Sequence, residues 1–531
     1  MSDNLSWDFP YTSLRSPVLA DNMVCTSQPL ASMAGIRAFD QGGNAVDAAL
    51  AAAITLTVVE PCMNGIGGDV FALVWDGDHM HGLNASGRAP RAWTPAHFAR
   101  YEAMPPRGWD SVTVPGAVSG WRALSDRFGK LPFGDLFASA IRHARDGYIV
   151  SPIVSRQWQH QIAEIKDVAG FADAFAPKGR APLPGERFTC PGQAATLEAI
   201  ARTGGDDFYR GALARRIAQY ARDTGGLMDE QDLAEHQADW VEPISMAYRD
   251  IELHEIGPNG QGIAALMALG ILDQLQGELP PVDSVPYFHR QIEAMKLALA
   301  DVHRHVADPA AMTVSAAQLL DRGYLKKRAA LLDPNAALFP GPGKPHNGGT
   351  VYLTTGDQGG MMVSLIQSNF KGFGSGLVVP GTGIALHNRG WGFNLIPGHP
   401  NEVGPRKRPF HTIIPGFLME QGRPLMSFGV MGGSLQAQGH VQVATRIAGY
   451  RQNPQAVIDA PRWRILEDNV RVMVEWNFPA QAVEGLRALG HQVQVAARHS
   501  DEFGGAQAIM RLAEGYLGAS DHRKDGQALG C

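Results

Sequence analysis

The stretch KPHNGGTVYLTTGDQGGMMVSLIQSNFKGFGSG, residues 344–376, decides the fold that we expect for this chain. Two glycines, Gly348 and Gly349, end a segment rich in proline and glycine and stand directly before Thr350. Glycine pairs that end a loop before a strand are common, so the pair by itself predicts only a turn and the start of a strand. The segments TVYLTT and MMVSLIQS flank GDQGG, and this pattern predicts a β-hairpin.

The rest of the chain mixes helical and strand patterns on both sides of this stretch. Residues 29–43 predict a helix ended by a glycine pair, and the alanine-rich residues 44–59 predict a tightly packed helix. Strands are expected at 69–75, 79–86, 413–420 and 424–431, and a further helix near 440–450. Residues 121–332 are mainly helical in pattern, and 333–349 break every pattern. This distribution favours a layered α/β sandwich that both parts of the chain complete.

Composition excludes several classes of protein. The chain has 531 residues, of which 45% are hydrophobic and 18% charged, as expected for a soluble globular protein. With a formal net charge of -6 and no basic run longer than PRKRP at 405–409, it does not resemble a nucleic-acid-binding protein. The most hydrophobic stretch, 44–59, is too short to span a membrane and contains Asp47.

Two further features concern the compartment in which the protein works. The first residues lack a secretory signal pattern, and the four cysteines are scattered without the paired spacing of a zinc site. We therefore expect a cytoplasmic protein with reduced thiols, no membrane attachment, no metal and no cofactor.

A set of motifs can be compared with known families. The first 121 residues contain GGNAVDAALAAAITLTVVEP, NGIGGDVFALVW, GRAP and TVPGAVSGW; the later part contains NGGTVYLTT, VSLIQSNFKGFGSGLVVPGTGI, GPRKRPFHTIIP, GVMGGS and DAPRWR. In this order, and over nearly the whole chain, they resemble the gamma-glutamyltransferase family of N-terminal-nucleophile hydrolases.

The resemblance implies a four-layer αββα sandwich made as one precursor that cleaves itself. The large subunit would be residues 1–349, with a helical lobe at about 121–332 and a flexible tail at 333–349. The small subunit would be residues 350–531 and would begin with the catalytic Thr350. The two subunits would stay together, and a dimer of such processed heterodimers is a further expectation.

The chemistry of such a site explains the motif around Gly349. A threonine hydroxyl is a weak nucleophile until a base takes its proton. In this family that base is the α-amine of Thr350 itself, which exists only after the Gly349–Thr350 bond is cut. A residue without a Cβ before Thr350 leaves the bond open to attack by the hydroxyl.

Other roles carry over from the family to matching positions. The resemblance gives Gly432 and Gly433, in GVMGGS, the backbone N–H groups of an oxyanion hole. Such donors typically contribute about 3–4 kcal/mol each to lowering the barrier. Ser368 stands where the family has a second hydroxyl residue that bonds the nucleophile.

The substrate pocket departs from the family pattern in the residues that hold the α-carboxylate. The arginine motif reads SGRAP, which places Arg88 one position out of register, and a pair of serines is replaced by His411 and Thr412. Arg88, His411 and Thr412 are therefore candidate substrate-binding residues.

The residues that should accept hydrogen bonds from an α-amine are also replaced. Arg389 and Gly392 stand where a glutamine and an aspartate are expected, and Phe370 takes the place of an asparagine. Because a buried ammonium without acceptors is costly, a pocket with Arg88, Arg389 and His411 favours an anionic group without an amine.

Three hypotheses follow for the function. The first is a self-processing hydrolase that acts on a small anionic amide of the oxamate or glutaryl-amide kind. The second is a true gamma-glutamyltransferase or glutathione hydrolase. The third, from another class, is a non-catalytic member that binds an anionic metabolite and does not cleave itself.

Overall fold

A computed structural model describes residues 14–168, 170–275, 277–338, 349–498 and 500–531. Residues 339–348 of the expected flexible tail, which include Gly348, lie outside the described residues. Gly349 and Thr350 are consecutive residues of one strand, so the structure is that of the uncleaved chain.

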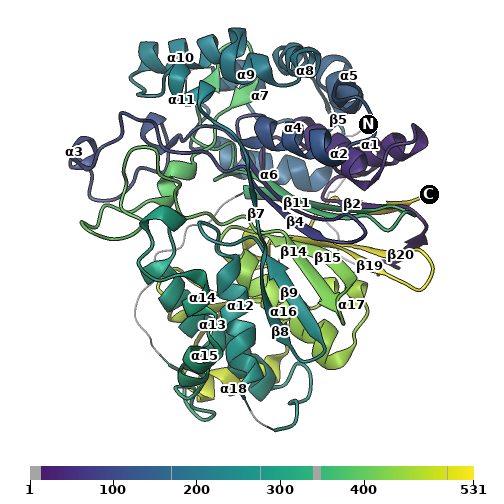
Figure 1. Cartoon of the computed structure of the whole chain (residues 1–531), viewed down its shortest axis with the longest axis vertical. Helices are drawn as coiled ribbons and strands as arrows, with labels where there is room; N and C mark the ends of the chain where they lie inside the picture. Colours follow the sequence, from purple (N-terminus) through teal and green to yellow (C-terminus); the bar gives the residue numbers. More distant parts are fainter. Residues whose placement is uncertain (1–13, 169, 276, 339–348, 499) are drawn as a thin grey trace.

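Two seven-stranded antiparallel sheets pack face to face at the centre of the molecule (Figure 1). The first has the order β21 (Gln527–Gly530), β2 (Met23–Thr26), β10 (Gly349–Gly356), β11 (Met362–Phe370), β3 (Asp69–Trp75), β4 (Met80–Asn84) and β7 (Asp239–Val241). The second has the order β1 (Val18–Ala20), β20 (Tyr516–Ser520), β19 (Gly505–Arg511), β15 (Arg423–Met431), β14 (Gly416–Glu420), β9 (Ile251–Glu255) and β8 (Ile244–Tyr248). Phe71, Tyr352 and Phe417 belong to the apolar layer between the two sheets.

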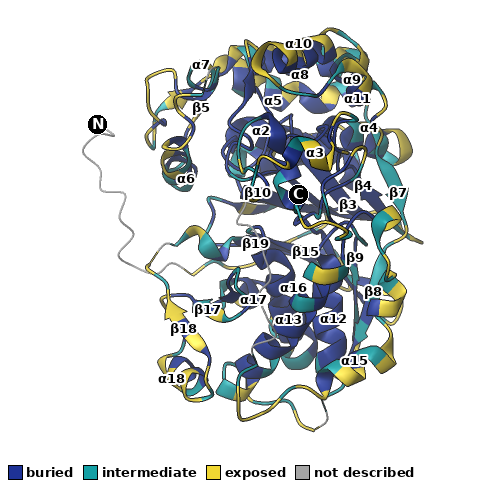
Figure 2. Cartoon of the chain, turned by 90° about the vertical axis from the view of Figure 1, so that its left-hand side faces the viewer, coloured by how far each residue is buried: buried dark blue, intermediate teal, exposed yellow. Residues whose placement is uncertain are grey.

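Helices cover the outer face of each sheet. Above the first sheet in Figure 1 lie α1 (Pro29–Asp40), α2 (Ala45–Val59), α4 (Ala117–Phe128), α5 (Ala138–Asp146), α8 (Pro191–Thr203) and α10 (Ala212–Thr224). Below the second sheet lie α12 (Gly262–Asp273), α13 (Val285–His305) and α16 (Leu435–Tyr450). The innermost helices of both layers are dark blue in Figure 2, which marks them as buried. The predicted four-layer αββα architecture is confirmed.

The buried helix α2 shows how the sequence sets one of these layers. All 15 of its residues are buried, and seven of its first nine are alanine or valine. Small side chains allow close approach to α1 and to the sheet below. Asn44 and Asp47 form a reciprocal capping box that satisfies the first backbone N–H groups of the helix.

Residues 121–332 contain more than the helices that their pattern predicted. Strand β7 joins the edge of the first sheet, and β8 and β9 join the edge of the second. Each sheet therefore combines strands from residues before and after Thr350. Among the described residues, no helix has the length and apolar character needed to cross a membrane.

Strand register places the centre of the site at one end of the first sheet. Gly349 pairs with Phe370 and Val351 with Gln367, with an irregularity between them at Thr350. On the other side of β11, Ser368 pairs with Asp69, the first residue of β3. Thr350, Ser368 and Asp69 thus lie at the same end of three adjacent strands.

Candidate active site

The hydroxyl of Ser368 lies between the side chain of Thr350 and the backbone of Gly349. Thr350 Oγ1 donates to Ser368 Oγ at 3.2 Å, and Ser368 Oγ donates to the carbonyl oxygen of Gly349 at 2.6 Å. Both hydroxyl residues are buried. A Cβ added to Gly349 would lie 3.0 Å from Met63 Sδ, so packing also favours glycine at this position. Ser368 therefore bonds both the Thr350 hydroxyl and the carbonyl group that directly precedes Thr350.

Two buried glutamines support this centre, and sequence analysis identified neither. Gln436 Nε2 donates to Thr350 Oγ1 at 3.3 Å, while its Oε1 accepts from the Ile414 N–H. Gln261 Nε2 donates to the carbonyl oxygen of Gly433 at 2.8 Å. Gln436 is the second residue of the helix that follows the glycine pair. This position close to the proposed oxyanion hole could have identified it as a site residue. No feature of the sequence pointed to Gln261.

Gly432 and Gly433 form the turn between β15 and α16. Their φ angles are +129° and +62°, values that favour glycine. Their carbonyl oxygens accept from the N–H groups of Leu435 and Gln436. Within the described part of the chain, the N–H groups of the two glycines donate no hydrogen bond. Two adjacent free N–H groups at the start of a helix are suited to bind an oxyanion.

Arg389 brings a positive charge into this centre. It is completely buried; its Nη2 donates to Ser368 Oγ at 3.1 Å and its Nη1 to Thr412 Oγ1 at 2.9 Å. Its guanidinium carbon lies 4.2 Å from the centre of the Phe370 ring. Burial lowers the pKa of Arg389 to about 9, a value that leaves it protonated at neutral pH.

The charge of Arg389 is not neutralised by a direct partner. Among the described residues it forms no ion pair with a carboxylate, and its buried Nε has no hydrogen-bond partner. Asp69 acts on this charge only through space. A buried cation without a directly bonded counter-ion is costly, so this arrangement is suited to an anionic ligand.

Asp69 and His411 form a buried pair near Arg389. His411 Nε2 donates to Asp69 Oδ2 at 3.0 Å, and the N–H groups of Gly87 and Gly116 donate to Asp69 Oδ1. Burial alone would raise the pKa of Asp69, but His387, His411 and Arg389 hold it well below its usual range. Asp69 stands in the motif NGIGGDVFALVW, where a carboxylate at the start of an apolar strand was a usable signal.

His411 differs from the anion-binding pocket residue that we expected. Burial and the nearby Arg389 lower the pKa of His411 to about 3, so its ring is neutral at pH 7. Its second nitrogen, Nδ1, accepts from the Ile413 N–H at 3.3 Å. With both ring nitrogens engaged, His411 has no free donor for a ligand and instead helps to fix Asp69.

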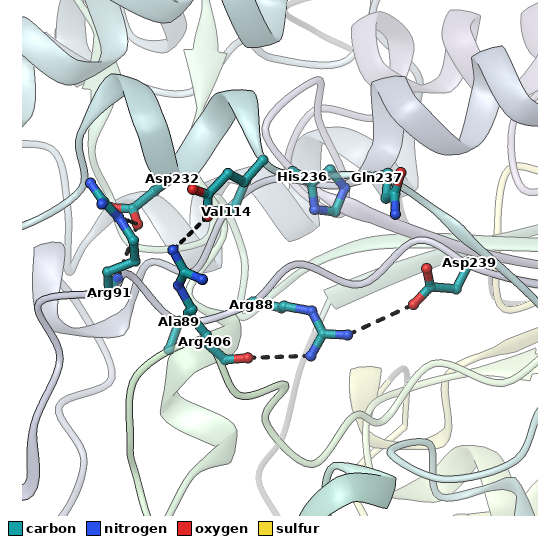
Figure 3. Close-up of a pocket in the computed structure, with 10 residues that line it drawn as sticks. Arg88, Ala89, Arg91, Val114, Asp232, His236, Gln237, Asp239 and Arg406 are labelled. Atoms are coloured by element: carbon teal, nitrogen blue, oxygen red, sulfur yellow. Dashed lines mark hydrogen bonds and ion pairs between the residues drawn. The ribbon is translucent and has the colours of Figure 1, made fainter.

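Arg88 lies in a different place from the residues around Thr350. Its half-exposed guanidinium forms ion pairs with Asp308 at 3.2 Å and Asp239 at 3.8 Å. It lines a cavity of about 350 Å³ whose lining includes none of Thr350, Ser368 or Arg389. Figure 3 shows Arg88 directed toward Asp239 and the backbone oxygen of Arg406. The structure therefore brings Gly349, Thr350, Ser368, Arg389 and Thr412 together, and leaves Arg88 outside this group.

Comparisons with known proteins cover nearly the whole of this chain. The family described as Gamma-glutamyltranspeptidase matches residues 31–531. The chain is 36% identical over 524 residues to the glutathione hydrolase-like YwrD proenzyme of Bacillus subtilis, covering 97% of this chain and 99% of that protein. It is 36% identical over 528 residues to the oxamate amidohydrolase proenzyme of Klebsiella pneumoniae, with the same two coverages. The crystal structure of cephalosporin acylase from Bacillus halodurans has a TM-score of 0.95 and 46% identity, and the match covers 99% of both chains.

Proposed function

Because the chain belongs to the gamma-glutamyltranspeptidase family and is an N-terminal-nucleophile hydrolase, we propose that it cleaves itself before Thr350 and then hydrolyses small anionic amides. The observation that carries this proposal is the buried guanidinium of Arg389, which forms no direct ion pair among the described residues and lies two hydrogen bonds from the Thr350 hydroxyl. The test is hydrolysis of oxamate and of glutaryl-p-nitroanilide by the processed protein.

Self-cleavage begins at the contact between Thr350 and Gly349. Thr350 Oγ1 attacks the carbonyl carbon of Gly349, the C–N bond breaks, and the hydroxyl proton passes to the nitrogen of Thr350. Water then hydrolyses the resulting ester, which releases the carboxylate of Gly349 and the free hydroxyl of Thr350. Ser368 supports this step because its hydroxyl already donates to the carbonyl oxygen on which negative charge develops.

Amide hydrolysis then uses the α-amine that cleavage has released. This amine, with a reference pKa of roughly 7.7–8.0, takes the proton of Thr350 Oγ1 and passes it to the leaving amine. The N–H groups of Gly432 and Gly433 receive the oxyanion of the tetrahedral intermediate. Water hydrolyses the acyl-enzyme ester and releases the acid. The same hydroxyl thus serves in both reactions.

Selection for an anionic substrate rests on the replaced residues around Arg389. Nη1 of Arg389 is anchored on Thr412, and Gly392 and Phe370 offer no side-chain acceptor to an ammonium group. A carboxylate is attracted to Arg389, whereas the α-ammonium of a gamma-glutamyl group is repelled by it. Two relatives, an oxamate amidohydrolase and a cephalosporin acylase, are named for activities on other amides, and this supports the choice.

Subunit association follows from the sheets. Strands β21, β10 and β11 of the proposed small subunit pair with β2 and β3 of the proposed large subunit within one sheet. Cutting the Gly349–Thr350 bond removes none of these pairings, and we propose that the large and small subunits remain one folded body.

Substitution of Gly433 by alanine should reduce turnover about 10²-fold. The φ of +62° is unfavourable for a residue with a Cβ, so relaxation of the turn would move the N–H groups of the proposed oxyanion hole. The measurement is kcat with oxamate or glutaryl-p-nitroanilide as substrate. The control is Gly422→Ala, in an open turn with a φ of +75°, where the same strain should leave kcat close to that of the parent. Equal kcat values for the two variants would exclude Gly433 from the mechanism.

A further inference from the structure

We infer that Arg389 also acts in self-cleavage, as a positioning residue that acts through Ser368 on the carbonyl group of Gly349. This inference rests on the proposed cleavage of the Gly349–Thr350 bond. It assigns Arg389 a role before any substrate is bound, because its contacts to Ser368 and Thr412 are already present in the uncleaved chain.

The hydrogen bonds around Ser368 fix the direction of its proton. Besides the Thr350 hydroxyl at 3.2 Å, its oxygen accepts from two N–H donors, the Phe370 N–H at 2.7 Å and Arg389 Nη2 at 3.1 Å. A hydroxyl has a single proton, so with these groups donating to its oxygen the proton points at another acceptor. That acceptor is the carbonyl oxygen of Gly349 at 2.6 Å. The two donors therefore hold Ser368 as a donor to the bond that is cut.

The backbone at Phe370 supports the same arrangement. Its φ of +73° is in the left-handed region, which is uncommon for a bulky residue. Such strain persists only where surrounding contacts enforce it, and here the Phe370 N–H bonds Ser368 while the ring lies under Arg389. The segment thus holds both donors on one hydroxyl.

The charge of Arg389 gives this geometry its expected effect on rate. When Thr350 Oγ1 bonds to the carbonyl carbon, the Gly349 oxygen becomes an oxyanion and its hydrogen bond from Ser368 strengthens. The guanidinium of Arg389 donates to Ser368 and so polarises the Ser368 hydroxyl toward the Gly349 oxygen. The site is buried, and among the described residues no carboxylate bonds the guanidinium directly, although Asp69 acts on it through space, so the interaction is weakly screened.

The experiment follows cleavage itself and needs no substrate. The parent, Arg389→Lys, Arg389→Met and Arg389→Ala are made by cell-free translation, and intact masses are recorded at timed intervals. We expect Arg389→Met and Arg389→Ala to be cut at least about tenfold more slowly than the parent. The cleavage rate of Arg389→Lys should lie between that of the parent and those of these two variants. Added guanidinium chloride, at concentrations that leave the fold intact, should accelerate Arg389→Ala and not the parent.

A matched control separates this role from loss of stability. Arg408 is another buried arginine, which bonds Asp239 and the Ser86 carbonyl and contacts neither Ser368 nor Gly349. Arg408→Met should lower Tm but leave the cleavage rate within about threefold of the parent. The inference is overturned if Arg389→Met is cut at the parent rate, or if both Met variants slow equally and guanidinium has no effect. A parent that is never cut before Thr350 would instead remove the proposed function, and this inference with it.

Discussion

Thr350→Ala should remain a single chain, whereas the parent should yield a fragment whose first residue is Thr350. The reason is that, in the proposed reaction, the Thr350 hydroxyl attacks the Gly349 carbonyl. Among the described residues no other side chain bonds both Ser368 and Gln436. Intact-mass spectrometry and N-terminal sequencing of the small fragment measure the outcome. The effect is expected to be complete, because alanine supplies no nucleophile.

Two further variants show whether the hydroxyl at this position is what matters. Thr350→Ser keeps a hydroxyl and should still be cut at the same bond. Thr355→Ala removes a buried hydroxyl from the same strand, where it donates to the Ala45 carbonyl, and should be cut like the parent. Cleavage of Thr350→Ala, or cleavage of the parent at another bond, would show that Thr350 is not the nucleophile.

Much of the fold was accessible from the sequence because its elements have clear local patterns. The apolar run at 69–75 predicted the strand that the structure places at Asp69–Trp75. The hairpin around GDQGG was predicted for the same reason, and it is formed by β10 and β11. Strands β7, β8 and β9 were missed because each has at most five residues and lies in a range dominated by helical periodicity.

The candidate site was only partly accessible from the sequence. The motifs nominated Thr350, Ser368 and Arg389, which the structure brings into one hydrogen-bonded group. They could not show that Arg88 pairs with Asp308, which is 220 residues away along the chain. Nor could they show that burial keeps His411 neutral, because desolvation depends on the packing of distant segments.

The processed protein should hydrolyse glutaryl-p-nitroanilide at least as well as gamma-glutamyl-p-nitroanilide. The two compounds share the scissile amide and a terminal carboxylate, and differ mainly in the α-ammonium of the second. An ordinary gamma-glutamyl pocket prefers the second compound, because its acceptors would otherwise be left unpaired. Here Arg389 stands in place of such an acceptor, so the ammonium is repelled while the carboxylate is attracted. Steady-state kcat/KM values for both compounds, per processed active site, give the measurement.

The arginine variants connect this preference to a particular side chain. Loss of charge in Arg389→Met should raise KM for the glutaryl compound through lost carboxylate binding, and normalising to the processed fraction separates this effect from slower cleavage. The same change at Arg88 should alter KM far less, because Arg88 is half-exposed and already pairs with Asp308 and Asp239. A kcat/KM that favours the gamma-glutamyl compound by ~100-fold, or about 2.7 kcal/mol, would contradict the proposed pocket. The ammonium would then have acceptors near Arg389, and the protein would be a gamma-glutamyltransferase in the full sense.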